Sequence, residues 1–161
     1  MDRTLIDRYE ADADLPARAI AGLTPADLTA FPGPGAWSIH QVVLHLMDSD
    51  LIGSDRMKRV AAEPSPPSLI GYDETAFANH LHYHEQDPVT ACEVFRLNRK
   101  MTAALLRLLP DEAFARVGNH SERGPETLRH LVEGYLDHAR YHVRFIADKR
   151  ARLGKPWGPP A

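Results

Sequence analysis

Apolar residues recur at helical spacing in four long stretches of this chain, and this pattern constrains the fold more than any other feature. The alternation of apolar and polar residues that marks half-buried strands is rare. The sequence therefore predicts an all-α fold, a four-helix bundle in which the apolar stripes of four amphipathic helices face one another. We expect one such domain over residues 1–161, because 161 residues with 43% apolar content suit one globular unit.

Caps and prolines mark the first two helices. The first helix is expected over residues 4–22 with a bend at Pro16, which cannot donate a backbone hydrogen bond. Ser38 and Gln41 have the spacing of a capping box, so the second helix is expected to begin there and to continue to about Glu63.

A long connection is expected between the second and third helices. Prolines at 64, 66 and 67 end the second helix, and Asp73 can begin a short helix within the connection. Asp87 as N-cap starts the third helix, which Pro110 stops. The fourth helix is expected over residues 124–153. The sequence therefore predicts a bundle with a long crossover between helices 2 and 3.

Charge and cysteine content exclude several classes of protein. The 19 Lys and Arg against 22 Asp and Glu give a formal charge of −3, so no excess of positive charge is available for nucleic acid. The single cysteine, Cys92, excludes intrachain disulfides and CxxC-type sites. The chain has neither a signal-peptide pattern at its start nor an apolar run of roughly 18 to 20 residues. We therefore expect a cytoplasmic protein with no membrane partner.

The chain holds nine histidines, of which His138 and His142 lie near the middle of the fourth helix. Their spacing places them on the face formed by Leu128, Leu131, Gly134, Tyr135, Phe145 and Ile146. Imidazoles four residues apart on a helix can bind one metal ion. A pair of histidines bonded to backbone or carboxylate is an equally open interpretation of the spacing alone.

The second helix supplies His45 as a candidate third ligand, at the flank of the apolar arc formed by Val42, Leu46, Ser49 and Gly53. Asp48 follows one turn later and is a candidate to orient an imidazole, to bind the metal weakly or to act as a base. The alternatives are a hydrogen-bonded, partly buried His45 and a solvated Asp48.

Three stretches of the sequence resemble the DinB/YfiT-like superfamily of metal-binding four-helix bundles, and the resemblance covers nearly the whole chain. They are PGAWSIHQVVLHL over residues 34–46, GPETLRHL over 124–131 and HARYH over 138–142. In that family, the histidine after the WSxxQ-type helix start and both histidines of the late HxxxH bind one divalent ion. The corresponding residues here are His45, His138 and His142.

The resemblance implies a metal-dependent enzyme that acts on a small molecule. Family members include thiol-dependent S-transferases, mycothiol-dependent isomerases and proteins named only as metal-dependent hydrolases. The expected cofactor is one divalent ion, with Zn²⁺ and Ni²⁺ suiting imidazole ligands about equally, and a low-molecular-weight thiol is a candidate cosubstrate. A homodimer also agrees with the resemblance. Ala139 stands where HExxH metalloproteases have their glutamate, so peptide hydrolysis is disfavoured. The alternative is a non-catalytic stress-response protein with a structural metal.

Other polar residues have simpler interpretations. His80, His82 and His84 form a rival metal cluster, but their place in the long connection favours an exposed loop. Cys92 is expected to be a small core residue. Asn98 lies among the apolar residues Val94, Met101 and Leu105 and needs a hydrogen-bond partner. We expect a solvated position for several further residues: His40, His120, His130, Arg96, Arg99 and Lys100.

Overall fold

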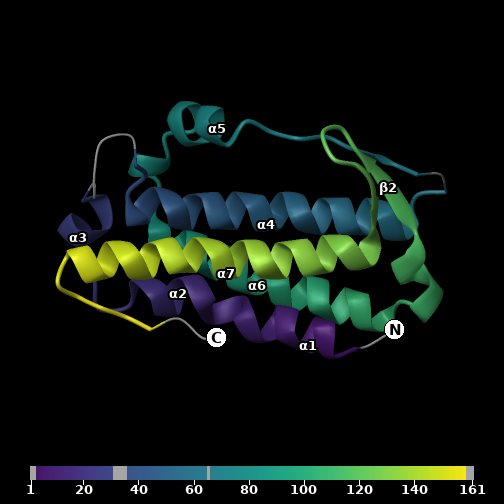
Figure 1. Ribbon diagram of the computed structural model, residues 1–161, viewed down its shortest axis with the longest axis horizontal. Coiled ribbons are helices and arrows are strands. Elements are labelled where there is room, and N and C mark those ends of the chain that lie inside the picture. The colour runs from purple at the N-terminus through teal and green to yellow at the C-terminus, as the bar shows by residue number, and fades with distance from the viewer. Residues whose placement is uncertain (1–2, 31–35, 65, 159–161) are drawn as a thin grey trace.

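The computed structural model describes residues 3–30, 36–64 and 66–158 (Figure 1). Four long helical segments make up most of it, and the predicted four-helix bundle is confirmed. The first segment is split into α1 (Thr4–Ala11) and α2 (Leu15–Ile20), and the others are α4 (Ile39–Ala62), α6 (Pro88–Leu108) and α7 (Leu128–Arg152). Shorter helices are α3 (Pro25–Thr29) and α5 (Glu74–His80), and 3₁₀ turns span Asp12–Asp14, Tyr83–Glu85 and Asp111–Ala115.

The four helical segments are arranged so that α4 packs against α6 and α7, while α1 and α2 pack against the same two helices from the other side. Helices α4 and α6 run in the same direction, as do α1 and α7 (Figure 1). Parallel neighbours cannot be joined by a short turn, because the chain must return along the length of the bundle. This geometry accounts for the long crossover over residues 63–87, which carries α5.

Helix starts agree closely with the sequence predictions. The Ser38 hydroxyl accepts a hydrogen bond from the Gln41 backbone N–H at 3.2 Å, and the Gln41 side chain accepts one from the Ser38 N–H at 3.0 Å. This reciprocal capping box begins α4 as expected. Asp87 and Asp73 cap α6 and α5 through their carboxylates. Pro16 lies in the first turn of α2, where its missing N–H costs nothing, and the bend predicted there is the break between α1 and α2.

The predicted start of the fourth helix was wrong by four residues. Residues Gly124–Thr127 form strand β3, which pairs antiparallel with β2 (Val117–His120), and β2 pairs in parallel with the short β1 (Ser68–Leu69). Because β3 lies at the edge of this sheet, Pro125 can occupy it without breaking a ladder hydrogen bond. Helix α7 begins after Thr127, whose hydroxyl accepts from the His130 N–H.

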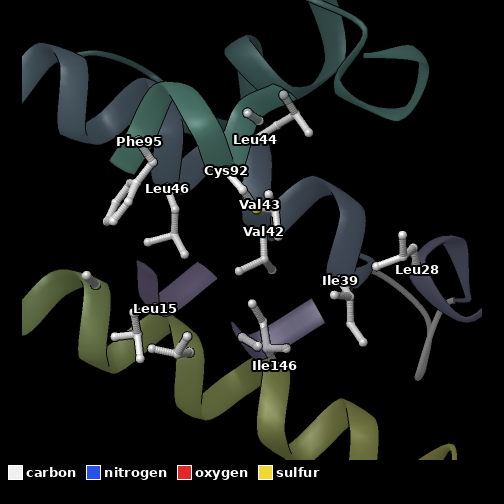
Figure 2. Packing of buried hydrophobic residues seen from close by; sticks show 14 of the residues in the cluster. Leu15, Leu28, Ile39, Val42, Val43, Leu44, Leu46, Cys92, Phe95 and Ile146 are labelled. Carbon is white, nitrogen blue, oxygen red and sulfur yellow. The ribbon is translucent and has the colours of Figure 1, made fainter. Parts of the chain in front are cut away.

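The hydrophobic core forms two clusters along the bundle. One surrounds the start of α4 and the end of α7, with Leu15, Val42, Phe95 and Ile146 among its members (Figure 2). The other lies at the opposite end, around Ile6, Met57 and Leu106. Cys92 is buried in the first cluster, and burial raises its thiol pKa to about 12, so its predicted role as a core residue is confirmed.

Two predicted helix faces were partly wrong. On α6, Met101 is 71% exposed, and the buried face instead includes the polar residues Arg99 and Thr102. On α7, Gly134 and Phe145 are exposed. The buried residues that the sequence pattern passed over on α7 are Val132, Leu136, Ala139 and Val143. The pattern failed because apolar residues alone do not define the buried face of a helix that also carries buried polar side chains.

No helix in the described part of the chain is both long and apolar enough to cross a membrane.

Candidate metal centre

Three imidazole rings meet between α4 and α7. His45 is completely buried, and its Nε2 lies 3.2 Å from Nε2 of His138. The ring of His142 lies 4.6 Å from that of His45 and 4.5 Å from that of His138, measured between centroids. Each residue offers one ring nitrogen such that all three nitrogens lie within 4.8 Å of one another. The two separate motifs of the sequence therefore converge on one point.

Local structure explains how these rings are positioned. One helical turn separates His138 from His142, so both project from the same side of α7. His45 lies on the second turn of α4, whose start the capping box at Ser38 determines. The indole of Trp37 packs edge-on against the His45 ring at 5.2 Å. His45 is therefore fully enclosed, whereas the sequence pattern placed it at the flank of the core.

Burial keeps the three imidazoles neutral. It lowers the pKa of His45 to about 3, of His138 to about 3 and of His142 to about 4, with the neighbouring imidazoles adding to the first two shifts. A neutral imidazole has an unprotonated ring nitrogen, and that nitrogen is the form that binds a metal. The cluster is therefore in the ligating state at neutral pH.

The three histidines fit a divalent metal ion. Bonds of about 2.0 to 2.1 Å in a tetrahedral arrangement place two ligand nitrogens roughly 3.3 Å apart, and Nε2 of His45 and Nε2 of His138 are 3.2 Å apart. The hydrogen-bonding capacity of the rings is also incompletely used. Nδ1 of His45 is buried without a hydrogen-bond partner in the described residues. A donor set of three imidazoles suits Zn²⁺ or Ni²⁺ and leaves coordination positions for other ligands.

A cleft of about 190 Å³ opens beside the imidazoles. His138 belongs to both the histidine cluster and the cleft wall. The other lining residues come from α4, the crossover with its helix α5, the β2–β3 hairpin and α7: Ser49, Arg56, Tyr72, Glu74, Arg123, Glu126, His130, Leu131, Gly134 and Tyr135. A small molecule in this cleft would therefore lie next to the cluster.

Glu74 is the carboxylate nearest to the cluster, with Oε2 at 4.0 Å from Nε2 of His45. Partial burial, together with the charges of Asp73 and Glu122, raises its pKa. The sequence analysis did not single it out. Its position after the Asp73 N-cap placed it at the start of α5, but only the packing of the crossover against α4 brings it to the cleft.

Asp48 lies one turn after His45, as expected, but its environment is different from that of Glu74. The Tyr83 hydroxyl donates a hydrogen bond of 2.6 Å to Asp48 Oδ2. Asp48 does not line the cleft in the part of the chain that the structure describes. Its predicted role as a base therefore stays a prediction.

The rival histidine segment is exposed. His82, His84 and Glu85 lie close enough to share an ion, but all three are at the surface, and His80 is not part of the group. Exposed clusters of this kind are common without a metal. The expected exposure of these histidines is therefore confirmed, although His80 ends helix α5 and His84 lies in a 3₁₀ turn.

Three residues expected at the surface are buried. His40 is held by a contact of 2.6 Å between its Nε2 and the Gln86 carbonyl oxygen. His120 lies on β2, and its Nδ1 accepts from the Glu122 N–H. Arg99 is only 1% exposed and pairs with Asp50. His40 and Arg99 have partners distant in sequence, and His120 lies on an unpredicted strand, which is why local patterns missed their burial.

Asn98 has the partner that its position required. Its side-chain amide donates to the Asp50 carboxylate at 2.7 Å and to the Asp50 carbonyl at 3.0 Å. The amide therefore ties α6 to α4.

Comparison with known proteins agrees with this architecture. The model of the DinB superfamily matches residues 8–146. The chain is 28% identical over 145 residues to "Putative metal-dependent hydrolase YfiT" of Bacillus subtilis (strain 168), an alignment that covers 88% of this chain and 81% of that protein. It is 29% identical over 153 residues to "Putative metal-dependent hydrolase BcerKBAB4_2443" of Bacillus mycoides (strain KBAB4), covering 92% and 87% of the two chains.

Solved structures show the same fold. The structure of YfiT from Bacillus subtilis, described as having an unusual four-helix bundle topology, superposes with a TM-score of 0.86 at 27% identity, covering 96% of this chain and 87% of that one. A DinB-like protein of the same species, at 16% identity and a TM-score of 0.64, shares the fold. With a family match over most of its length and this bundle topology, the chain belongs to the DinB superfamily.

Proposed function

We propose that this protein is a metal-dependent enzyme of the hydrolase type that acts on a small molecule. His45, His138 and His142 would bind one divalent ion, Zn²⁺ or Ni²⁺, and the substrate would occupy the cleft. The supporting observation is that a buried cluster of three neutral imidazoles adjoins an open cleft through His138. The names of the relatives point to the same class of activity.

A bound divalent ion would supply Lewis-acid chemistry, producing a nucleophile at neutral pH from water or from a thiol. The residues of this chain contribute the rest. We assign the role of general base to Glu74, because it lies on the cleft wall beside the cluster and its raised pKa makes it a better proton acceptor near neutral pH. Asp48, with the Tyr83 hydroxyl bound to it, is the second candidate.

Thiol transfer is a more specific reaction that the same site could catalyse. A low-molecular-weight thiol would then take the place of water as nucleophile, and the same base would accept its proton. An activity assay distinguishes the two nucleophiles. Turnover by the zinc-loaded and nickel-loaded protein should be measured with a panel of esters, amides and alkyl halides, with and without added thiols.

Metal content tests the proposal directly. We expect the purified protein to bind about one divalent ion, and the double variant His138→Ala, His142→Ala to bind none, because three imidazole nitrogens are needed to hold the ion tightly. The matched control is His82→Ala, His84→Ala, which removes two histidines of an exposed cluster. Elemental analysis by mass spectrometry gives both numbers.

Two results would contradict the proposal. Equal metal content in the double variant and the unchanged protein would remove the buried histidines as ligands, especially if the surface variant lost the ion. Stoichiometric metal bound by a fourth protein ligand, with no turnover on the whole panel, would instead indicate a structural ion in a non-catalytic protein.

A further inference from the structure

The cleft contains an arginine that forms no ion pair with the described residues. Arg56, on α4, lines the cleft and is only 5% exposed. Across the described residues, no carboxylate oxygen forms an ion pair with its guanidinium group. An arginine side chain keeps its charge in proteins, and a buried charge without a partner of opposite sign is costly. Arg56 is therefore an unusual residue for a merely structural role.

Hydrogen bonds hold the Arg56 side chain in place without neutralising it. One terminal nitrogen, Nη1, donates to the Tyr135 hydroxyl at 2.7 Å, and Nη2 donates to the Ile70 carbonyl oxygen. The third donor, Nε–H, is buried and has no partner among the described residues. With one N–H of each terminal nitrogen engaged and Nε–H unpaired, the planar five-donor group is oriented and still able to bind an acceptor.

The backbone of α4 is shaped to allow this arrangement. A Cβ atom at Gly53 would lie 2.6 Å from the Tyr135 ring, so only glycine lets that ring pack flat against the helix one turn before Arg56. The ring in turn carries the hydroxyl that orients Arg56. Tyr135 and Arg56 therefore lie together in the cleft wall, and Gly53 leaves room for the Tyr135 ring.

Of the two arginines that line the cleft, Arg123 has an ion pair and Arg56 has none among the described residues. Arg123 is neutralised by Glu126 through contacts of 2.8 and 3.0 Å. His120 is buried beside Arg56 and Arg123, and its Nε2 is a further buried atom with no partner in the described part of the chain. Tyr72 is also on this wall, and burial raises its pKa to about 12, so its hydroxyl stays protonated. This side of the cleft favours an anion.

We propose that Arg56 binds the carboxylate of a small substrate, so that the substrate class is a monocarboxylic acid whose reacting group points toward His138. A single unbalanced guanidinium group suits one negative charge, and its planar geometry matches the two oxygens of a carboxylate. Glu74, which lines the same cleft, would repel a second negative charge. The inference rests on the proposed function for the reaction, but the anion site itself does not need a metal.

Propionate and its neutral isostere propionamide are suitable probes. Binding should be followed by nuclear magnetic resonance on the full chain, with the Arg56 Nε–H resonance as the reporter, in metal-free and zinc-loaded protein. We expect propionate to shift this resonance in both forms and propionamide to leave it unchanged. Arg56→Gln should weaken propionate binding at least tenfold. The matched control is Arg59→Gln, which removes the same charge from an exposed position one turn away on α4.

The outcomes separate this inference from the metal proposal. Equal effects of propionate and propionamide would overturn it, as would propionate binding that occurs only with zinc present and is unchanged in Arg56→Gln. Propionate binding at Arg56 in a protein that binds no metal would support the inference while contradicting the proposed function. If Arg56→Gln does not fold, the response of the Arg56 resonance in the unchanged protein still decides the question.

Discussion

Two buried arginines on neighbouring helices differ in how their charge is accommodated. Arg99, on α6, donates to the Asp50 carboxylate at 2.8 Å and to the Tyr135 carbonyl at 2.6 Å, and its guanidinium lies 4.4 Å from the centre of the Tyr9 ring. Arg56, on α4, has hydrogen bonds but no ion pair within the described residues. Asn98 completes the first network by donating to Asp50.

The difference distinguishes a buried network within the fold from the candidate site. Around Arg99 the chain supplies every counter-charge itself, and the resulting contacts join α1, α4, α6 and α7. Around Arg56 and the three histidines, buried nitrogens lack partners and the surface is open to a cleft. Buried polar groups that the protein leaves unsatisfied indicate a ligand, whereas those it satisfies indicate a role in the fold.

Asp50→Asn is expected to have the largest effect on stability. It leaves the Arg99 guanidinium buried without a counter-charge, which costs about 3 to 5 kcal/mol. Urea unfolding followed by circular dichroism measures the loss. Asp55→Asn is the control, since it breaks an exposed ion pair on the same helix and should cost less than about 1 kcal/mol. Similar losses in the two variants would show that the buried network does not stabilise the fold.

Glu74→Gln should affect activity far more than stability. The residue is half exposed, so the free energy of unfolding should change by less than about 0.5 kcal/mol. If Glu74 is the base, kcat for an active substrate from the panel should fall about 100-fold or more, equivalent to roughly 2.7 kcal/mol.

The companion variant for this test is Asp48→Asn. A large fall in kcat for that variant and none for Glu74→Gln would transfer the role of base to Asp48. Steady-state kinetics over pH 6 to 9 would measure kcat for both variants. The pH profile is informative because a general base also determines its acidic limb.

Acid should destabilise the metal-free protein through the histidine cluster. The pKa values of about 3 to 4 in the folded state lie below the ordinary value near 6.5, so the unfolded chain binds more protons over this interval. Stability is therefore complete above about pH 6.5 and is lost as the pH falls toward 4. Each imidazole contributes a slope of up to about 1.4 kcal/mol per pH unit.

The variant His142→Leu tests this prediction. It should reduce the slope of the unfolding free energy against pH by the contribution of one imidazole. Thermal or urea unfolding of the metal-free protein at pH 7, 6 and 5 measures the slopes. Identical slopes in the variant and the unchanged protein would show that other groups control the acid response. His130→Leu, at an exposed histidine of the same helix, is the control and should leave the slope unchanged.

Local sequence signals predicted the parts of the fold that local interactions control. The capping box of Ser38 and Gln41 and the Asp87 cap depend on residues three positions apart or fewer, and both were placed correctly. Residues 124–127 were assigned to the fourth helix because a glycine and a proline precede a helical pattern there. Their pairing with β2 depends on a partner strand that has no strong signal of its own.

The candidate site likewise has features that local sequence predicts and features that depend on tertiary packing. The sequence by itself determined which histidines could converge, because His138 and His142 share a helix face and the motif around His45 marks a second helix. Tertiary structure alone decided what surrounds them. Glu74 reaches the cleft through the crossover, and Arg56 lines the same cleft without an ion pair among the described residues. Burial, and hence the neutral state of the imidazoles and the unbalanced charge of Arg56, comes from contacts between distant segments, which no periodicity within one helix encodes.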